Sequence, residues 1–335
     1  MDITKKEDMI SYLKDNGIIS DAEPYSINYC SGGVSCPVAL IETGGRTLLI
    51  KQGRARLAVK EEWLADPART NLEGKGAAYY HKYLPETQPD VLINDEENHI
   101  FVREAIPAGC HMWKADLMEG ILDFKVARRT MEVMATVHSC SAKDPDVPHV
   151  FNNYNNIYEL RVSPYIQFVA KKYPQLAKVS DEVSDLIMNT HQVLVHGDYS
   201  PKNIIVTPER EVCVVDSEPV HCGNAICDVS NFTTHIVLKS AYLRKYSAAF
   251  LNMLVDMTDT YFSSIDFADP KVVEANCMKA LGMIALARID GKSPAEYITD
   301  EETKDLVRKM SFALIESDIT TYRQAAELFY GLESK

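Results

Sequence analysis

The stretch VLVHGDYSPKNIIV, residues 193–206, is followed by VCVVDSE, residues 212–218, and the two together decide the fold class. They contain runs of β-branched and apolar residues that indicate short strands and a small hairpin, at 192–195, 204–207 and 212–215. The polar residues between these runs therefore fall on loops at the ends of strands, where side chains are available for chemistry.

Three of these polar residues are spaced for phosphoryl transfer. Asn203 follows Asp198 by five residues, and Asp216 follows Asn203 by thirteen. The carboxylate of Asp198 can accept or orient the proton of an attacking hydroxyl. The Asn203 amide oxygen and the Asp216 carboxylate can hold Mg²⁺, because this ion takes a few protein oxygens together with phosphate and water.

HGDYSPKN followed by VVDSE resembles the HGDxxxxN and later Asp signature of the aminoglycoside phosphotransferases, choline kinases and their relatives. Those proteins share a protein-kinase-like, two-lobed α+β fold. The resemblance implies a small N-terminal lobe with an antiparallel sheet, a larger and mainly helical C-terminal lobe, and ATP and Mg²⁺ as cofactors. It also implies that Asp228 and His196 support the catalytic loop.

The resemblance predicts a nucleotide-binding lysine and its glutamate partner upstream. Lys51 lies in the β-type run TLLIKQ, and Glu73 lies 22 residues later on an expected helix from 67 to 83. Glu61 and Glu62 are alternative partners for the lysine.

The same resemblance assigns two further nucleotide contacts. Ser31, Gly32 and Gly33 stand where relatives cover the triphosphate with a small-residue loop, and the alternative is an ordinary hairpin turn. Glu104 and Ile106 stand at the joint between lobes, where backbone groups would receive the adenine edge.

The period of the apolar residues changes along the chain. Strands are expected over 25–30, 37–42, 47–52, 90–93 and 100–103, and helices over 4–16, 122–139, 154–172, 178–190, 224–238, 241–263, 268–289 and 301–330. We therefore expect an N-terminal nucleotide-binding lobe over 1–104, a hinge over 105–110 and a helical lobe with the acceptor pocket over 111–335.

The first third of the chain is similar to methylthioribose kinases, where a Lys-Gln pair precedes a basic segment, a Trp and an Arg. Asp216-Ser-Glu218 also matches their Asp-x-Glu metal motif, so Glu218 is a further metal ligand or else a solvated hairpin acid. Asn203 departs from that family, which has another small polar residue at this position. Substrate contacts are expected from Arg288, Asp290 and Tyr199. The alternative for the first two is a charged interhelical turn, and the alternative for Tyr199 is a packing role.

Composition excludes several classes of protein. The formal net charge is −13, so nucleic-acid and anionic-membrane partners are disfavoured. The eight cysteines lack paired CxxC spacing, and the N-terminus lacks a signal-peptide pattern, which together predict a cytoplasmic protein with reduced thiols. A homodimer is left open.

These observations predict an ATP- and Mg²⁺-dependent kinase acting on a hydroxyl of a small molecule, first a sugar such as methylthioribose or a related polyol. An aminoglycoside, choline or another amino alcohol is the alternative acceptor, slightly favoured by the acidity of the chain. A catalytically silent nucleotide-binding regulatory protein is an alternative of another class. It is disfavoured because such proteins commonly lose one of three residues that this chain keeps, Lys51, Asp198 and Asp216.

Overall fold

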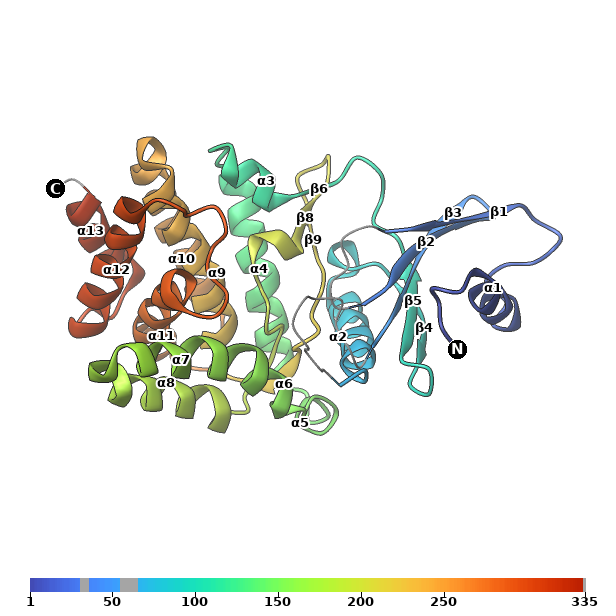
Figure 1. Cartoon of the computed structure of the whole chain (residues 1–335), viewed down its shortest axis with the longest axis horizontal. Coiled ribbons are helices and arrows are strands. Elements are labelled where there is room, and N and C mark those ends of the chain that lie inside the picture. The colour runs from blue at the N-terminus through green and yellow to red at the C-terminus, as the bar shows by residue number, and fades with distance from the viewer. Residues whose placement is uncertain (31–35, 55–65, 334–335) are drawn as a thin grey trace. The chain divides into compact units, whose positions relative to one another are not determined.

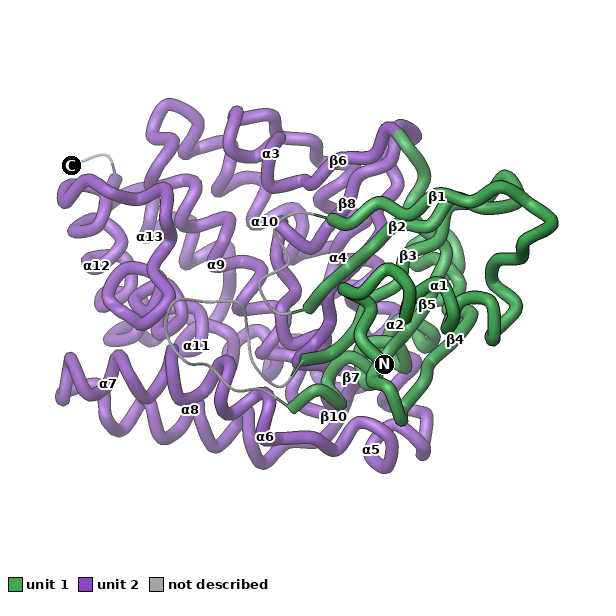
Figure 2. Tube along the Cα trace, turned by 45° about the vertical axis from the view of Figure 1, so that its right-hand side comes forward, with its two compact units in different colours: residues 1–108 green, residues 109–335 purple. Residues whose placement is uncertain are grey.

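The computed structural model describes residues 1–30, 36–54 and 66–333. The chain divides into two compact units, Met1–Ala108 and Gly109–Lys335, which Figure 2 shows in different colours. The division falls inside the segment 105–110 that we expected to join two lobes.

Unit 1 is built on a five-stranded antiparallel sheet with the strand order β1-β2-β3-β5-β4 (Figure 1). The strands are β1 (Tyr25–Tyr29), β2 (Val38–Thr43), β3 (Arg46–Gln52), β4 (Val91–Asp95) and β5 (Ile100–Glu104). Gly44 and Gly45 close the β2–β3 hairpin with φ angles of +54° and +73°, a pair of values that favours glycine and suits the twist of two adjacent strands. All five strands overlap the expected ones.

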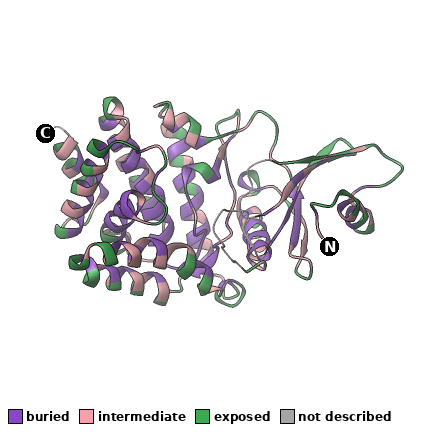
Figure 3. Cartoon of the chain, in the orientation of Figure 1, coloured by how far each residue is buried: buried purple, intermediate pink, exposed green. Residues whose placement is uncertain are grey.

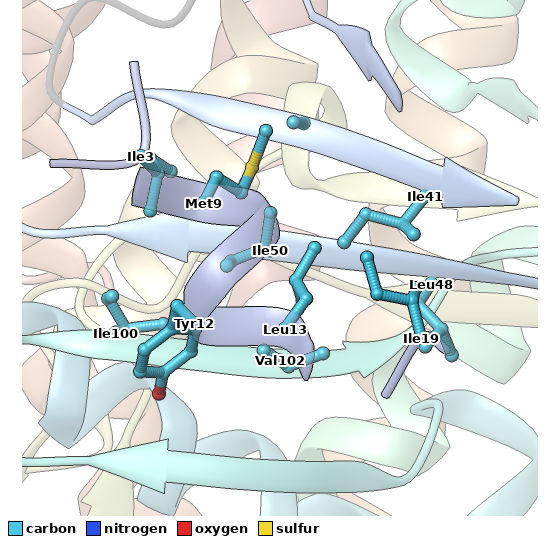
Figure 4. Packing of buried hydrophobic residues seen from close by; sticks show 11 residues of the cluster. Ile3, Met9, Tyr12, Leu13, Ile19, Ile41, Leu48, Ile50, Ile100 and Val102 are labelled. Atoms are coloured by element: carbon cyan, nitrogen blue, oxygen red, sulfur yellow. The ribbon is translucent and has the colours of Figure 1, made fainter. Parts of the chain in front are cut away.

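Helices cover both faces of this sheet. Because side chains alternate between the two faces along each strand, neighbouring residues of one strand contact different helices. Figure 4 shows α1 (Lys6–Asp15) packing its apolar side chains, including Met9 and Leu13, onto Ile50 of β3. The next residue, Lys51, points to the other face and meets α2 (Arg69–Tyr83). A short 3-10 turn, η1 (Pro85–Thr87), leads from α2 to β4.

Unit 2 is mainly helical, with two small sheets. The sheets are β6-β8-β9, from β6 (His111–Met112), β8 (Ile204–Val206) and β9 (Val212–Val214), and β10-β7, from β7 (Val193–Val195) and β10 (His221–Gly223). The expected hairpin is formed by β8 and β9. The run before the HGD motif instead pairs with β10, a strand that the sequence did not predict because His-Cys-Gly has little β-type character.

The longer helices of unit 2 pack in one bundle. Helix α9 packs against both α10 and α11, α10 also packs against α4, and α11 packs against α12. Figure 3 shows buried residues along α9 and α11. The bounds are α3 (Trp113–Met118), α4 (Phe124–Ser141), α5 (Val147–Val150), α6 (Tyr154–Ile157), α7 (Phe168–Lys172), α8 (Ala177–Asn189), α9 (Ile226–Tyr242), α10 (Ser247–Ser264), α11 (Pro270–Asp290), α12 (Glu301–Glu316) and α13 (Tyr322–Glu333), with 3-10 turns η3 (Pro174–Leu176), η4 (Pro201–Asn203) and η5 (Arg244–Tyr246).

Two expected helices are not continuous. The segment 301–330 forms α12 and α13, separated at Ser317–Thr321, where Tyr322 starts the second helix by donating its N–H to Glu274 of α11. The segment 154–172 contains a π-helix, η2 (Tyr158–Gln167), with Pro164 inside it. A proline lacks the N–H that an α-helix needs at that position, so the wider turn accommodates it.

Candidate active site

In unit 1, the predicted lysine and glutamate form an ion pair. Nζ of Lys51 on β3 lies 2.7 Å from Oε2 of Glu73 on α2, and each side chain is only 7% exposed. The pairing holds the ammonium in one place. The alternative partners Glu61 and Glu62 lie outside the described residues, as does the expected phosphate loop with Ser31, Gly32 and Gly33.

The two expected adenine contacts differ in their backbone hydrogen bonds. The N–H of Glu104 donates to Asp90 at 3.0 Å, and its carbonyl accepts from Nη1 of Arg103 at 2.9 Å. Glu104 therefore offers a base only the second lone pair of its carbonyl. Ile106 makes no backbone hydrogen bond within the described part of the chain, so both its N–H and its carbonyl stay predictions for the adenine edge.

In unit 2, the HGD turn leaves β7 through a glycine. Gly197 has a φ of +79°, and a Cβ at this position would lie 2.6 Å from the carbonyl oxygen of Pro219. Only glycine fits a positive φ together with so close a backbone. The turn places Asp198 beyond the strand end, while the following residues enter η4.

A buried carboxylate braces this turn from below. Asp228, in the first turn of α9, accepts the backbone N–H of His196 at 2.7 Å and that of Gly197 at 2.9 Å. Burial raises the pKa of Asp228, but the hydrogen bonds from His138 and from the His196 backbone lower it by more, and the net pKa lies below its ordinary value. The residue is therefore an ionised acceptor with a positioning role.

His196 connects the HGD turn to the segment after β9 that carries Asp216. Its Nδ1 accepts the N–H of Asp198 at 3.2 Å, and its Nε2 lies 3.1 Å from the carbonyl oxygen of Val215. Because a carbonyl only accepts, Nε2 carries the proton. Burial lowers the pKa of His196, which keeps this single neutral tautomer.

The Asp198 carboxylate is held by three donors. Nη2 of Arg161 lies 2.6 Å from Oδ1, Nζ of Lys202 lies 2.9 Å from Oδ2, and Nδ2 of Asn203 donates to the same oxygen at 3.1 Å. Arg161 also donates from Nε to the carbonyl of Gly197 at 2.8 Å. The carboxylate therefore has one fixed orientation, flanked by two cations.

The expected metal ligands supply oxygen donors of the kind that Mg²⁺ prefers. One carboxylate oxygen of Asp216 and one of Glu218 lie within 4.8 Å of each other. Asn203 uses its Nδ2 for Asp198, so its amide oxygen is the atom left for an ion. Asp216 has a φ of +65°, a strained value for a residue with a side chain, and such strain is often found at functional sites. These residues fit a magnesium ion.

Two candidate substrate residues are engaged in contacts within the protein. Tyr199 is fully buried, and its hydroxyl donates to the carbonyl of Thr130 at 2.8 Å, so it packs the core. Asp290 accepts hydrogen bonds from Lys172 at 2.5 Å, from Tyr173 at 2.8 Å and from Arg308 at 2.8 Å. Its carboxylate ties three elements together and is occupied in that structural role.

Arg288, the third expected substrate residue, has a different environment. Its Nη1 donates to the carbonyl of Ser293 at 2.6 Å and to the hydroxyl of Tyr165 at 3.2 Å. Its Nε is buried and finds no hydrogen-bond partner among the described residues. A substrate contact by Arg288 therefore stays a prediction.

Sequence reasoning missed Arg161 and left Lys202 without a role, although Lys202 lies within the quoted motif. Arg161 lies far upstream of Asp198 on η2, and only the fold brings it to the catalytic loop. One signal was present: Pro164 marks an irregular turn in an otherwise helical stretch, and π-helical turns are frequent at functional sites.

A comparison with known families gives a match to the model described as the phosphotransferase enzyme family, over residues 31–261. The chain belongs to this family. Its members transfer phosphoryl groups, and together with the kinase relatives the match makes this chain an enzyme of the small-molecule kinase type.

Individual relatives are distant in sequence. The methylthioribose kinase of Bacillus cereus (strain B4264) is 21% identical over 279 residues, covering 76% of this chain and 70% of the relative. A choline/ethanolamine kinase family protein from Mesorhizobium loti shares a TM-score of 0.51 at 16% identity, covering 98% of this chain and 99% of that one. Ethanolamine kinase from Plasmodium vivax gives 0.55 at 10% identity, with coverages of 100% and 89%. The structural likeness confirms the expected kinase-like α+β fold.

Within the described residues, no helix is both long and apolar enough to cross a membrane. All eight cysteines are thiols rather than disulfides.

Proposed function

We propose that this protein transfers the γ-phosphoryl group of ATP to a hydroxyl of a small molecule, with Asp198 orienting that hydroxyl. The observation that carries the proposal is the fixed carboxylate of Asp198, with Arg161 on one oxygen and Lys202 and Asn203 on the other. A hydroxyl that donates to this carboxylate is held in one direction for in-line attack. Positioning of this kind accounts for much of the catalysis in phosphoryl transfer.

The cations beside Asp198 supply electrostatic stabilisation in the same step. Negative charge develops on the transferring phosphoryl group, and fixed cations stabilise it without reorganising. The side chain of Lys202 is half-exposed, so its ammonium group could meet a phosphate as well as Asp198. Arg161 is tied to both Asp198 and Gly197, so its main role is to position the loop.

The side chains that would bind the cofactors are oxygen donors in unit 2 and a lysine in unit 1. Asn203, Asp216 and Glu218 would hold Mg²⁺, which when bound neutralises charge on the nucleotide phosphates. In unit 1, Lys51 held by Glu73 would bind the phosphates of ATP. Ile106 would offer its backbone to the base.

For the acceptor, the similarity to methylthioribose kinases favours a sugar or another polyol. An amino alcohol is the second candidate, because ethanolamine kinases share the fold. A silent regulatory protein is disfavoured, since Lys51 keeps its ion pair and Asp198 keeps its fixed geometry.

ADP release measured over a panel of sugars, polyols, amino alcohols and aminoglycosides tests the proposal. We expect Mg²⁺-dependent ADP release that needs an acceptor and yields a phosphorylated product. Tight binding of Mg·ATP without turnover on any acceptor would favour the regulatory protein.

A further inference from the structure

One face of α9 leads away from the catalytic loop and carries polar side chains. Asn231, His235 and Lys239 are spaced four residues apart and so lie above one another on one face. Asn231 donates from Nδ2 to the carbonyl of Tyr199 at 2.8 Å, which ties the start of this row to the loop that holds Asp198. Lys239 is eight residues further on, about 12 Å along the helix axis.

Lys239 is a buried cation with weak partners. The residue is only 1% exposed. Its Nζ lies 3.4 Å from the carbonyl of His235 and 5.4 Å from the centre of the Tyr297 ring. The side chain thus runs back along the helix toward the catalytic loop, and no carboxylate within the described residues bonds to it. A buried ammonium normally has such a partner.

Two other buried donors of unit 2 are also unsatisfied, one of them on the tyrosine beside Lys239. Nε of Arg288 and the hydroxyl of Tyr297 are buried and have no hydrogen-bond partner among the described residues. Arg288 reaches the hydroxyl of Tyr165, and the ring of Tyr165 lies 5.7 Å from the guanidinium carbon of Arg161, which bonds to Asp198. The unsatisfied donors and the catalytic carboxylate therefore belong to one connected region of unit 2.

This region brings several cationic side chains together in a protein whose net charge is −13. Burial lowers the pKa of His235, and four cations lower it further: Lys239, Arg288, Lys202 and Lys114. All four cations therefore act on this one ring. Arg161 adds a fifth cation. Burial, Lys114 and Arg288 also lower the pKa of Lys239 to about 7, against only a partial opposing effect from Glu296. Glu296 itself pairs with Lys114 at 2.5 Å.

We propose that Lys239, Arg288 and Tyr297 form an anion subsite, and that the acceptor is a hydroxylated small molecule bearing a carboxylate or a phosphate. This inference rests on the proposed function and deepens it. An anionic group would give the buried donors the partners they lack. A bound anion would also favour the protonated form of the Lys239 side chain, which carries a full positive charge. The same field repels choline and aminoglycosides, so it selects against the cationic acceptors.

The substrate test compares acceptors that differ only in charge. We would measure ADP release with glycerol, D-glycerate and glycerol 3-phosphate, with ribose and ribose 5-phosphate, and with choline. We expect kcat/KM for an anionic member to exceed that of its neutral parent by roughly tenfold or more, the effect of one charge-assisted hydrogen bond. The carboxylate and phosphate members show which anion is used.

Variants connect this preference to the subsite. Lys239→Met should raise KM for the anionic acceptor roughly tenfold or more while KM for ATP stays unchanged. Lys279→Met, on an exposed ion pair with Glu182 of the same unit, removes one positive charge elsewhere and should change neither value. If Lys239→Met does not fold, Tyr297→Phe removes a donor without changing charge and should raise the same KM in the same direction.

A binding measurement separates this inference from the proposed function. Inorganic phosphate and D-glycerate, added in the presence of Mg·ADP, should raise the unfolding temperature of the wild type more than that of Lys239→Met. That result without turnover on any acceptor would support the anion subsite and count against phosphoryl transfer. Turnover confined to neutral or cationic acceptors, or equal anion effects on both proteins, would overturn the anion subsite.

Discussion

Replacing Asp228 by alanine should loosen the catalytic loop from below. The carboxylate accepts two buried backbone N–H groups, from His196 at 2.7 Å and from Gly197 at 2.9 Å. Each buried donor left without an acceptor costs about 1–3 kcal/mol, so Asp228→Ala should lower the free energy of unfolding by about 2–6 kcal/mol. The same change should lower kcat, because Asp198 directly follows the two residues that lose their support.

Thermal or denaturant unfolding of the isolated variant measures this loss, with ADP release measured at a temperature where the variant is still folded. The matched control is Asp259→Ala, because Asp259 forms an exposed ion pair with Arg323 and should cost at most about 1 kcal/mol. If Asp228→Ala is no less stable than this control, the bracing role of Asp228 is wrong. If it is less stable but keeps the wild-type kcat, the brace does not position Asp198.

Three further predictions concern other sites. Stability of the wild type should rise as pH rises from about 7 toward 10, by up to about 1.4 kcal/mol per unit, because the folded state holds Lys239 at a pKa of about 7 and the unfolded state binds its proton more tightly. The slope should be smaller in Lys239→Met, and equal slopes would contradict the lowered pKa of the buried lysine. Lys51→Met combined with Glu73→Gln should be more stable than the sum of the single changes implies, by about 1–3 kcal/mol in a double-mutant cycle, whereas additive effects would show that the buried pair is not coupled. Tyr199→Phe should cost about 1 kcal/mol of stability, through the lost bond to Thr130, and leave KM for the acceptor unchanged; a raised KM would return Tyr199 to the substrate site.

The fold and the local parts of the site could be predicted because their signals are short-range. The strands of unit 1 follow alternating apolar residues between glycine turns, and the HGD motif with Asn203 lies within eight residues. The pairing of Lys51 with Glu73 was implied by the family resemblance, together with the order of strand and helix. Each of these features depends on contacts that a pattern of neighbours already constrains.

The rest depends on contacts between distant parts of the chain. Arg161 reaches Asp198 across 37 residues, and Asp290 meets Arg308 and Lys172 from two other helices. Nothing in the sequence around Asp290 distinguishes a substrate ligand from a buried ion pair. The break between α12 and α13 likewise depends on Glu274, which accepts the N–H of Tyr322. A cytoplasmic location and a homodimer stay predictions.

The most direct test of the account is the rate of ADP release by Asp198→Asn with an accepted acceptor. Asparagine keeps the size of the side chain but loses the negative charge that orients the hydroxyl and takes its proton, so we expect Mg·ATP binding to persist while kcat falls by roughly a hundredfold or more. Asp266→Asn, on an exposed pair with Lys143, should retain the wild-type rate. Undiminished turnover by Asp198→Asn would contradict the role of Asp198 and with it the proposed mechanism.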